Sequence, residues 1–262
     1  MEPDHGRPLT RKDALKLGLI AGIGAAGLSA APAVAQGAAE GQSLSTASFG
    51  ATGDGVTDDT QALQAAIDAC VRAGGGRVHI PAGRYRLTAP LVINSADRID
   101  LTGDGWSTRL LQENDAPALL WPEGKSCRES SVRNLAITAT TTDKSPSTPA
   151  IACLGGAERS FFHHLLFDRA GVRMGSGIVT EQVTDTTTFD HCLFWGGVSG
   201  TGIKVARGSE VRIFGGRIIG HDRENFPCIG VHLTNNNGGV HILTTDIIAL
   251  HTGLKKIGRA HV

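Results

Sequence analysis

The sequence has few aromatic side chains and no excess of charge of either sign. Phe, Trp and Tyr make up 5% of the 262 residues, and 25 basic side chains balance 25 acidic ones. A formal net charge of zero gives no electrostatic reason to expect nucleic acid or an anionic membrane as the partner. The length fits one globular domain of ordinary size.

The cysteines lack the spacing of a metal-binding motif. There are five, with no Cys-x-x-Cys pair and no histidine at zinc-like spacing, so no metal site is predicted. An odd number leaves at least one thiol free. Cys70 and Cys192 occupy positions where apolar side chains are expected, so most of the cysteines are predicted to be small core residues.

Glycine, by contrast, is abundant. The 35 glycines lack the every-third-residue period of collagen, so they indicate many turns between short strands. No long coiled-coil or trimerisation segment is visible. The composition therefore favours repetitive β structure.

Residues 1–35 have the composition of an export signal. Basic side chains precede an apolar stretch rich in Gly and Ala that runs from Leu17 to Ala35. The small residues at Ala33 and Ala35 suit signal peptidase, and cleavage is predicted after Ala35. A buried helix or a membrane anchor is the alternative, but the stretch is only weakly hydrophobic for a membrane span. A secreted, periplasmic or cell-envelope protein is therefore expected, with no membrane contact once the signal is removed.

The export route stays open between two pathways. Residues 10–16, TRKDALK, resemble the twin-arginine motif, but Lys12 replaces the second arginine and Ala14 stands where Phe is usual. These two departures leave the ordinary Sec route open. A small-residue linker, 36–47, follows, and the folded domain is predicted over 48–256.

The last six residues are predicted not to belong to the natural protein. Residues 257–262, IGRAHV, match the translation of a widely used sequencing-library adapter. On this hypothesis the reading frame leaves its insert near Lys256, and the natural protein continues with further coils. A longer genomic copy with a different sequence beyond this point would confirm it, whereas a native stop codon after Val262 would contradict it.

The folded domain opens with a long motif, FGATGDGVTDDTQALQAAIDACVRAGGGRVHIPAGRYRL, over 49–87. Asp58 and Gln61 have the spacing of a capping box at a helix start. Apolar side chains then recur on one helical face until three glycines, 74–76, end the helix. Val78, Ile80, Tyr85 and Leu87 alternate around a Pro-Ala-Gly turn, which predicts two paired short strands. An amphipathic helix of this kind suits the open end of a β solenoid.

The glycines of GATGDG also suggest a phosphate-binding loop. However, no Lys-Ser or Lys-Thr follows them, the spacing GxGxxG is absent, and no strand immediately precedes them. A nucleotide site is therefore the weaker interpretation.

This opening motif closely resembles the N-terminal signature of the pectate-lyase superfamily domain found in rhamnogalacturonase- and epimerase-like proteins, polygalacturonase relatives and phage tailspikes. The resemblance covers about forty residues sharply and the remainder loosely. It implies an all-β fold, a right-handed parallel β-helix with an N-terminal capping α-helix, and most often carbohydrate chemistry. Fold alone does not specify one reaction. The NTD, GHG and RIK segments of polygalacturonases are absent from this sequence, and its one Asp-Asp pair, Asp58-Asp59, belongs to the opening motif.

Strand-like segments recur with a loose period from Ala118 onward, which supports a solenoid independently of the resemblance. The first series comprises ALLW at 118, AIACL at 150, GIVTE at 177, GIKVA at 202 and GVHLT at 230. The second comprises VRNLAI at 132, FHHLLF at 162, FDHCLF at 189, FGGRII at 214 and LTTDII at 243. One coil per repeat stacks equivalent residues about 4.8 Å apart.

Stacking turns the columns of this alignment into spatial neighbours. The third column, Asn134, His164 and His191, predicts a polar ladder that satisfies turns, and we favour a structural role for it. The last column of the second series is apolar and comprises Ile137, Phe167, Phe194, Ile219 and Ile248. In the fourth column, where the first three coils have Leu135, Leu165 and Cys192, Arg217 and Asp246 predict an ion pair between adjacent coils.

The candidate site lies where the chain leaves the second series of strands. Its predicted catalytic residues are Asp168, Asp222 and Arg169, and its predicted substrate-binding residues are Trp195, His221 and Glu224. An exposed Trp among carboxylates suits sugar binding, because its apolar face stacks on pyranose rings. The alternative is a set of charged turns on a solvated surface.

The chemistry of this site stays open. Two coils separate Asp168 from Asp222, roughly 9–10 Å at the strand spacing, which is compatible with the acid and base of an inverting glycosidase. A lyase would use a base such as Arg169, with calcium to stabilise the charge of an uronate carboxylate; otherwise no cofactor is expected.

The prediction is therefore an exported polysaccharide-active protein, a glycoside hydrolase or polysaccharide lyase on uronate-containing or similar glycans. The alternatives are a polyuronate epimerase and a non-catalytic, glycan-binding or tailspike-like β-helix. The particular glycan and the oligomeric state cannot be inferred from the sequence.

Overall fold

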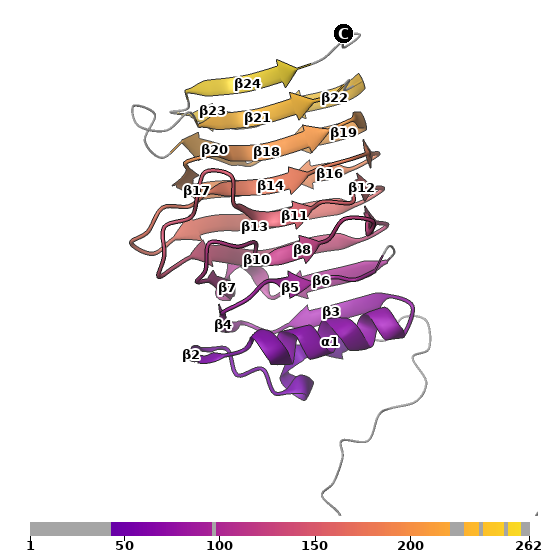
Figure 1. The fold of residues 1–262 in the computed structure, drawn as a ribbon, viewed down its shortest axis with the longest axis vertical. Helices are drawn as coiled ribbons and strands as arrows, with labels where there is room; N and C mark the ends of the chain where they lie inside the picture. Colours follow the sequence, from indigo (N-terminus) through magenta and orange to yellow (C-terminus); the bar gives the residue numbers. More distant parts are fainter. Residues whose placement is uncertain (1–42, 96–97, 221–227, 236–237, 249–250, 258–262) are drawn as a thin grey trace, which may run out of the picture. The chain divides into compact units, whose positions relative to one another are not determined.

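The computed structural model describes residues 43–95, 98–220, 228–235, 238–248 and 251–257. Over these residues the chain folds as the predicted right-handed parallel β-helix, with about seven coils (Figure 1). The predicted export segment, most of the linker and nearly all of the predicted adapter-derived tail lie outside the described residues. Among the described helices, none has the length and hydropathy needed to cross a membrane.

Each coil has three faces. Face 1 is the seven-stranded sheet of β5 (Leu91–Val92), β8 (Leu119–Trp121), β11 (Pro149–Cys153), β14 (Ser176–Thr180), β18 (Thr201–Ala206), β21 (Ile229–Thr234) and β24 (Thr252–Ile257). The other strands form one sheet of seventeen that bends at a corner into faces 2 and 3. The long strands β10 (Ser131–Ala139) and β13 (Phe161–Arg169) cross this corner, pairing with different strands before and after it.

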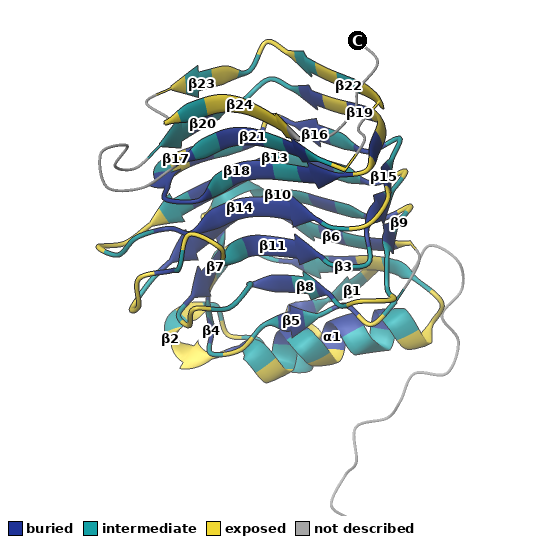
Figure 2. Cartoon of the chain, turned by 45° about the horizontal axis from the view of Figure 1, so that its top comes forward, coloured by how far each residue is buried: buried dark blue, intermediate teal, exposed yellow. Residues whose placement is uncertain are grey.

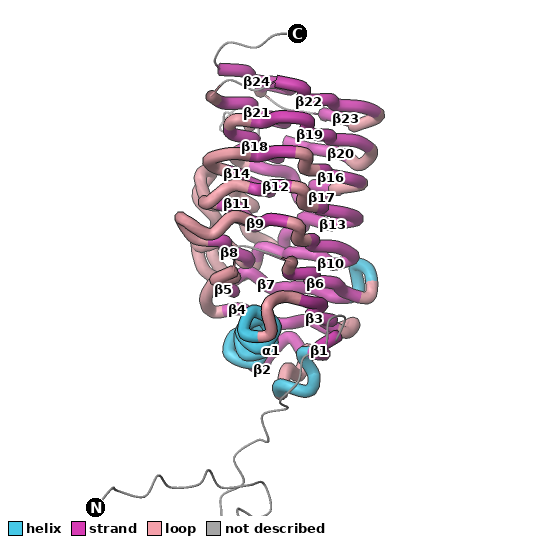
Figure 3. Tube along the Cα trace, turned by 90° about the vertical axis from the view of Figure 1, so that its right-hand side faces the viewer, coloured by secondary structure: helices cyan, strands magenta, loops and turns pink. Residues whose placement is uncertain are grey.

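Faces 2 and 3 follow face 1 along the chain. Face 2 contains β1 (Ser43–Ser45), β3 (Gly76–Ile80), β6 (Ile99–Gly103), β16 (Thr188–Asp190), β19 (Gly208–Phe214), β22 (Gly238–Leu243) and the short strands β9 (Cys127–Arg128), β12 (Ala157–Glu158) and β15 (Thr184–Asp185). Face 3 contains β2 (Asp54–Asp58), β4 (Gly83–Leu87), β7 (Thr108–Gln112), β17 (Leu193–Val198), β20 (Arg217–Gly220) and β23 (Asp246–Ile248). Figure 3 shows the strands stacked coil on coil.

The core fills the interior of the coils, because alternate side chains of every strand point inward. On face 1 the inward column is fully buried in its middle coils, at Leu119, Ile151, Ile178, Ile203 and Val231. On face 3 the buried rings of Phe167 and Phe194 stack with centroids 4.5 Å apart. Gly177 gives the Phe194 ring room, since a Cβ there would lie 1.9 Å from its Cε1 atom. Figure 2 shows this buried band along the middle strands.

The corner between faces 2 and 3 is made by one residue per coil in the left-handed conformation. Asn134, His164 and His191 have φ values of 55°, 51° and 49°, a region that short polar side chains enter more readily than apolar ones. The predicted polar ladder is present in part: His164 Nδ1 lies 3.3 Å from Asn134 Oδ1. His191 contacts Asp190 instead.

The helix α1 (Thr60–Arg72) covers the first coil (Figure 1). Its buried side chains, Leu63, Ala66, Ile67 and Cys70, are those of the predicted apolar face, and it packs against β1, β3, β4 and β5. Two short 3-10 helices, η1 (Thr46–Phe49) and η2 (Gly105–Ser107), lie in turns.

The predicted capping box is wrong. Asp59 is the N-cap residue, and its carboxylate accepts hydrogen bonds from the Thr52 and Gly53 amides, at 2.7 and 3.0 Å, rather than from the helix. Asp58 accepts the Thr60 amide hydrogen bond, at 3.0 Å. The buried Asp59 therefore joins the glycine-rich turn to the helix start.

The predicted pairing of the two strands after the helix is also wrong. β3 pairs with β1 and β6, whereas β4 pairs with β2 and β7, all in parallel. The Pro-Ala-Gly segment is thus a corner between two faces of one coil and not a hairpin turn. The alternating side chains are nevertheless buried as expected, because each strand presents one side to the core.

The predicted register of the second series is wrong by one residue in its last two segments. Phe189 pairs with Ile213 rather than Phe214, and Phe194 pairs with Ile218 rather than Ile219. Arg217 accordingly lies opposite Leu193, not Cys192. The slip arises because two adjacent positions are apolar in these coils, so apolarity alone does not define the inward one.

Other expectations are confirmed. The register of the first series holds in all five coils. Arg217 and Asp246 form the predicted ion pair, with Nη2 and Oδ2 3.1 Å apart. All five cysteines are buried, and no disulfide joins any two of them; burial raises the pKa of the Cys70 thiol to about 11.

Candidate functional site

The structure brings three of the predicted site residues together in an open groove of about 340 Å³, lined by Asp168, Arg169, Gly171, Trp195 and Gly196. Asp168 and Arg169 end strand β13, and Trp195 lies on β17 of the next coil. Their side chains meet because Phe167 and Phe194 pair in register, so the residues that follow them are neighbours on the outside of face 3.

Trp195 is the most prominent apolar group of this groove, with 59% of the residue exposed. An indole with this exposure has an apolar ring face available for contact with a ligand. Gly196 keeps the floor of the groove low: a Cβ there would lie 3.0 Å from the Arg169 amide nitrogen. Asp168 and Arg169 line the same groove as this ring. An aromatic ring together with polar groups is a combination suited to binding a sugar.

The charged groups of the groove are held in place by hydrogen bonds. Asp168 Oδ1 accepts the Arg169 amide hydrogen bond at 2.7 Å, and Oδ2 lies 3.3 Å from Arg109 Nη1. Arg169 Nε donates to the Gly196 carbonyl oxygen at 2.7 Å. Both carboxylate oxygens of Asp168 are thus engaged, and the Arg169 guanidinium also contacts the Val172 carbonyl oxygen, 3.5 Å from Nη1.

The other three predicted residues, Asp222, His221 and Glu224, lie outside the described residues. The expected separation of two carboxylates across two coils therefore stays a prediction.

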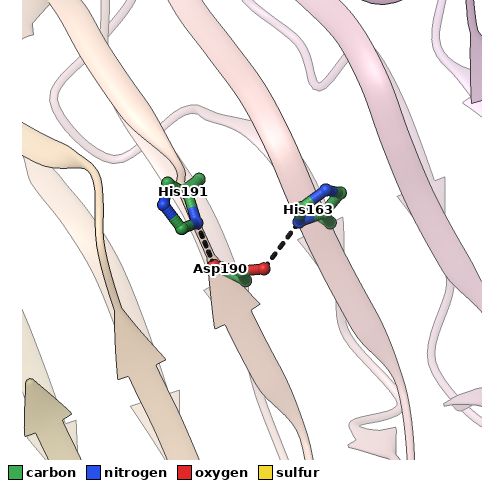
Figure 4. Close-up of side chains that lie close together, drawn as sticks. All are labelled: His163, Asp190 and His191. Atoms are coloured by element: carbon green, nitrogen blue, oxygen red, sulfur yellow. Dashed lines mark hydrogen bonds and ion pairs between the residues drawn. The ribbon is translucent and has the colours of Figure 1, made fainter.

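A second group, which the sequence did not reveal, lies on face 2 at its corner with face 3. His163, on β13, lies directly opposite Asp190, the last residue of β16, and the two are joined by a 2.7 Å hydrogen bond between Nδ1 and Oδ2. The Nδ1 atom of His191 contacts the other oxygen, Oδ1, of the same carboxylate. Figure 4 shows the two imidazoles on either side of Asp190.

The left-handed corner explains how two consecutive residues reach the same place. Successive side chains of a strand point to opposite sides, but the φ of 49° at His191 breaks this alternation. The Asp190 side chain is 10% exposed, whereas those of His163 and His191 are 35% and 60% exposed. A nearly buried carboxylate is therefore flanked by two accessible imidazoles.

Aromatic rings surround this cluster. Phe161 stacks on His163, with centroids 5.3 Å apart, and Phe214 meets the edge of His191 at 6.2 Å. Trp106, from η2, stacks on His164 at 4.8 Å. Burial, followed by the charges of His163 and His191, lowers the pKa of His164.

Face 1 carries a column of basic side chains on its outside. Lys204, His232 and Lys255 occupy equivalent positions on three successive coils. Lys204 pairs with Glu181. Burial, with added repulsion from Lys255 and Lys204, lowers the pKa of His232. Glu181 balances the charge of Lys204, and the lowered pKa of His232 favours its neutral form, so this column carries little excess positive charge.

The signal for the histidine cluster was present but not decisive. The aligned segments FHH and FDH place His163 over Asp190, 27 residues apart, whereas metal and catalytic motifs are usually recognised at short spacing. The conformation that brings His191 to the same side has no sequence signature of its own.

The model of the family described as rhamnogalacturonase A/epimerase, pectate lyase-like, matches residues 43–241. The chain belongs to this family. Among sequence relatives, mannuronan C5-epimerase AlgE5 of Azotobacter vinelandii is 68% identical over 40 residues, 15% of this chain and 4% of the relative. Alginate lyase 7 of the same organism is 65% identical over 40 residues, 15% and 5% of the two chains.

A third relative is not named as an enzyme. Plasmin and fibronectin-binding protein A of Streptococcus pneumoniae is 33% identical over 86 residues, which is 32% of this chain and 12% of the relative. The chain thus spans only a small part of the length of these relatives.

Two solved structures share the fold of this rhamnogalacturonase A/epimerase family member. One, assigned as a glycosyl hydrolase from Parabacteroides merdae, has a TM-score of 0.53 and 12% identity, covering 79% of this chain and 96% of that one. The catalytic unit of an α-1,3-glucanase from Streptomyces thermodiastaticus has a TM-score of 0.50 and 17% identity, covering 83% and 43%. At these identities the likeness shows the fold alone.

Proposed function

We propose that this chain is an exported polysaccharide-active protein that acts on uronate-containing glycans, as a glycoside hydrolase or a polysaccharide lyase. The observation that carries the proposal is the groove on face 3, which the exposed Trp195 lines together with Arg169 and Asp168. Membership of a carbohydrate-active family supports it, as do relatives named as epimerases and a lyase of uronate polymers.

The groove has the two kinds of group that an acidic glycan requires. The indole face stacks on the apolar face of a pyranose ring, and a guanidinium forms charge-assisted hydrogen bonds with an uronate carboxylate. A neutral glycan would gain from the indole but not from the charge of the guanidinium.

The reaction is tested by supplying the chain with a panel of acidic and neutral glycans, with and without calcium. A hydrolase releases reducing ends without ultraviolet absorbance, whereas a lyase releases unsaturated products that absorb. A calcium requirement for the absorbance would support the lyase. Failure to bind any glycan of the panel would contradict the proposal.

The binding site is tested with Trp195→Ala. We expect about tenfold weaker glycan binding, about 1.4 kcal/mol, with no change in the unfolding midpoint. Trp195→Phe should restore most of the affinity, because it keeps an aromatic face. Leu243→Ala is the matched control, since Leu243 is 60% exposed but lies on face 2. Equal affinity in the Trp195→Ala and wild-type proteins would remove the groove from the proposal.

The charge preference is tested with Arg169→Ala. Affinity for acidic glycans should fall and depend less on salt, whereas affinity for neutral glycans should change little. The reverse pattern would contradict the uronate assignment.

A non-catalytic glycan-binding protein is the second candidate. It is favoured by the Asp168 carboxylate, whose two oxygens are already engaged by the Arg169 amide and by Arg109. A carboxylate whose two oxygens already contact protein groups has less capacity left to contact a glycosidic oxygen. Glycan binding without turnover on every bound glycan would establish this alternative.

A further inference from the structure

The His163, Asp190 and His191 side chains present a set of donor atoms that the glycan groove does not use. One nitrogen from each imidazole and one carboxylate oxygen lie within 4.8 Å of one another. We propose that these three residues bind a divalent transition-metal ion of the zinc class. This site is independent of the proposed groove, because it lies on face 2 and shares none of its residues.

The hydrogen-bonded atoms of the cluster lie close enough together for one metal ion to contact all of them after a small movement. The 2.7 Å separation between His163 Nδ1 and Asp190 Oδ2 is set by a shared proton. A zinc ion binds imidazole nitrogen and carboxylate oxygen at about 2.0–2.2 Å, so it replaces that proton after a small outward movement of the rings. His191 approaches the other oxygen of the same carboxylate in the same way.

The donor types select the ion. Two neutral imidazoles with one carboxylate suit zinc, cobalt, nickel and copper. Calcium instead takes six to eight oxygen ligands, and this cluster offers only one carboxylate. The site therefore differs from any calcium site that a lyase reaction would use.

The electrostatics also favour a cation. The Asp190 side chain is 10% exposed. Within the described residues it pairs with His163 and His191 and forms no ion pair with a Lys or Arg. A nearly buried carboxylate requires a compensating positive charge or strong hydrogen bonds. The two imidazoles supply hydrogen bonds to this carboxylate, and a divalent ion would supply two positive charges.

The two rings are held in position from outside the cluster. The Phe161 ring stacks on His163 with an interplanar angle of 12°. Gly215, on the next coil, gives His191 room, because a Cβ there would lie 3.0 Å from three atoms of its imidazole. Ligands whose rotamers are restricted by packing lose less conformational freedom on metal binding.

Three protein ligands leave a coordination position for water. The exposed edges of His163 and His191 give solvent access to it, as in metal sites that are open rather than fully enclosed. The ion would also cross-link the coil that contains β13 to the coil that contains β16. Metal binding should therefore raise the unfolding midpoint as well as occupy the site.

The test is equilibrium dialysis of the 262-residue chain against zinc chloride, followed by elemental analysis. We expect one zinc ion per chain at saturation, and an affinity reduced at least 10-fold in His163→Ala and in His191→Ala. His79→Ala is the matched control: His79 also pairs with a carboxylate, Asp104, at 2.8 Å, but no second imidazole among the described residues shares it. This variant should bind zinc like the wild type.

Cobalt gives a readout that does not depend on affinity alone. Visible absorption typical of low-coordinate cobalt should develop with the wild type and the His79→Ala variant, and should be absent from a His163→Asn, His191→Asn double variant. The Asn side chains keep polar groups at both positions, and circular dichroism checks that the variant folds. No stoichiometric zinc in the wild type, or unchanged zinc binding in the double variant, would overturn the proposal.

Discussion

The two ends of the face 1 sheet bury equivalent side chains to very different extents. Leu91, on the first strand, is fully buried, whereas Leu254, on the last described strand, is 52% exposed. Both belong to the inward-facing column of face 1, because Leu91 pairs with Leu119 and Leu254 pairs with Val231. The two leucines differ because α1 packs against β5 and covers the first coil, whereas no described element follows β24. Burial in this fold thus comes from the neighbour along the axis as much as from the coil itself (Figure 2).

The largest effect is expected at the covered end. Leu91→Ala removes a fully buried side chain beneath α1 and should lower the free energy of unfolding by about 2–5 kcal/mol. Urea denaturation followed by circular dichroism measures this. A cost below about 1 kcal/mol would mean that the helix and the first coil rearrange freely, and the comparison between the two ends would fail.

A smaller loss of unfolding free energy is expected at Asp59, which joins the start of α1 to the glycine-rich turn before it. Asp59→Asn weakens the hydrogen bonds that the buried carboxylate accepts from the Thr52 and Gly53 amides, at an expected cost of about 1–3 kcal/mol. Asp54→Asn is the control, because Asp54 also accepts backbone hydrogen bonds but is exposed. Similar unfolding midpoints for the two variants would show that burial of Asp59 contributes nothing.

The pH dependence of stability should be greatest near the covered end. Burial opposes ionisation of Asp100, but hydrogen bonds from Ser131, Arg77 and Arg133 outweigh it and hold the pKa of this carboxyl below its ordinary value. The resulting stabilisation is complete above the unfolded pKa, near pH 4, and is lost as pH falls through the lower folded pKa. The destabilisation caused by Asp100→Asn should therefore shrink between pH 6 and strongly acidic solution. A constant difference would contradict the assignment.

The smallest effects are expected in the last described coil. Leu254→Ala and Asp246→Asn should each change the free energy of unfolding by no more than about 0.5 kcal/mol. Leu254 is half exposed, and the pair of Asp246 with Arg217 is accessible to solvent. A loss at Leu254 comparable to that at Leu91 would show that another part of the chain covers this coil.

The sequence was sufficient to predict the fold because apolar residues recur at equivalent positions of successive coils. The apolar columns gave the correct register for all five segments of face 1, and the Gly-rich motif with its amphipathic stretch predicted the capping helix. The register failed at Phe214, where Ile213 is equally apolar and only the left-handed corner at Gly215 distinguishes inward from outward.

The candidate sites were predictable to different degrees. Asp168 and Trp195 follow aligned buried phenylalanines, so counting from the apolar column placed them together correctly. The alignment also places His163 beside Asp190, although no site was predicted from it, and the position of His191 depends on one backbone angle. Side chains brought together by such a corner do not obey the alternation on which strand predictions rest.

The unequal lengths of the coils have an evolutionary consequence. Contacting residues of adjacent coils are separated by 24, 27, 29 or 30 positions, yet the strands stay in parallel register because the connecting loops absorb the difference. Insertions and deletions in a loop therefore leave the core unchanged. Natural selection can remodel the outer surface of one coil, or duplicate a whole coil, without having to reinvent the fold that carries it.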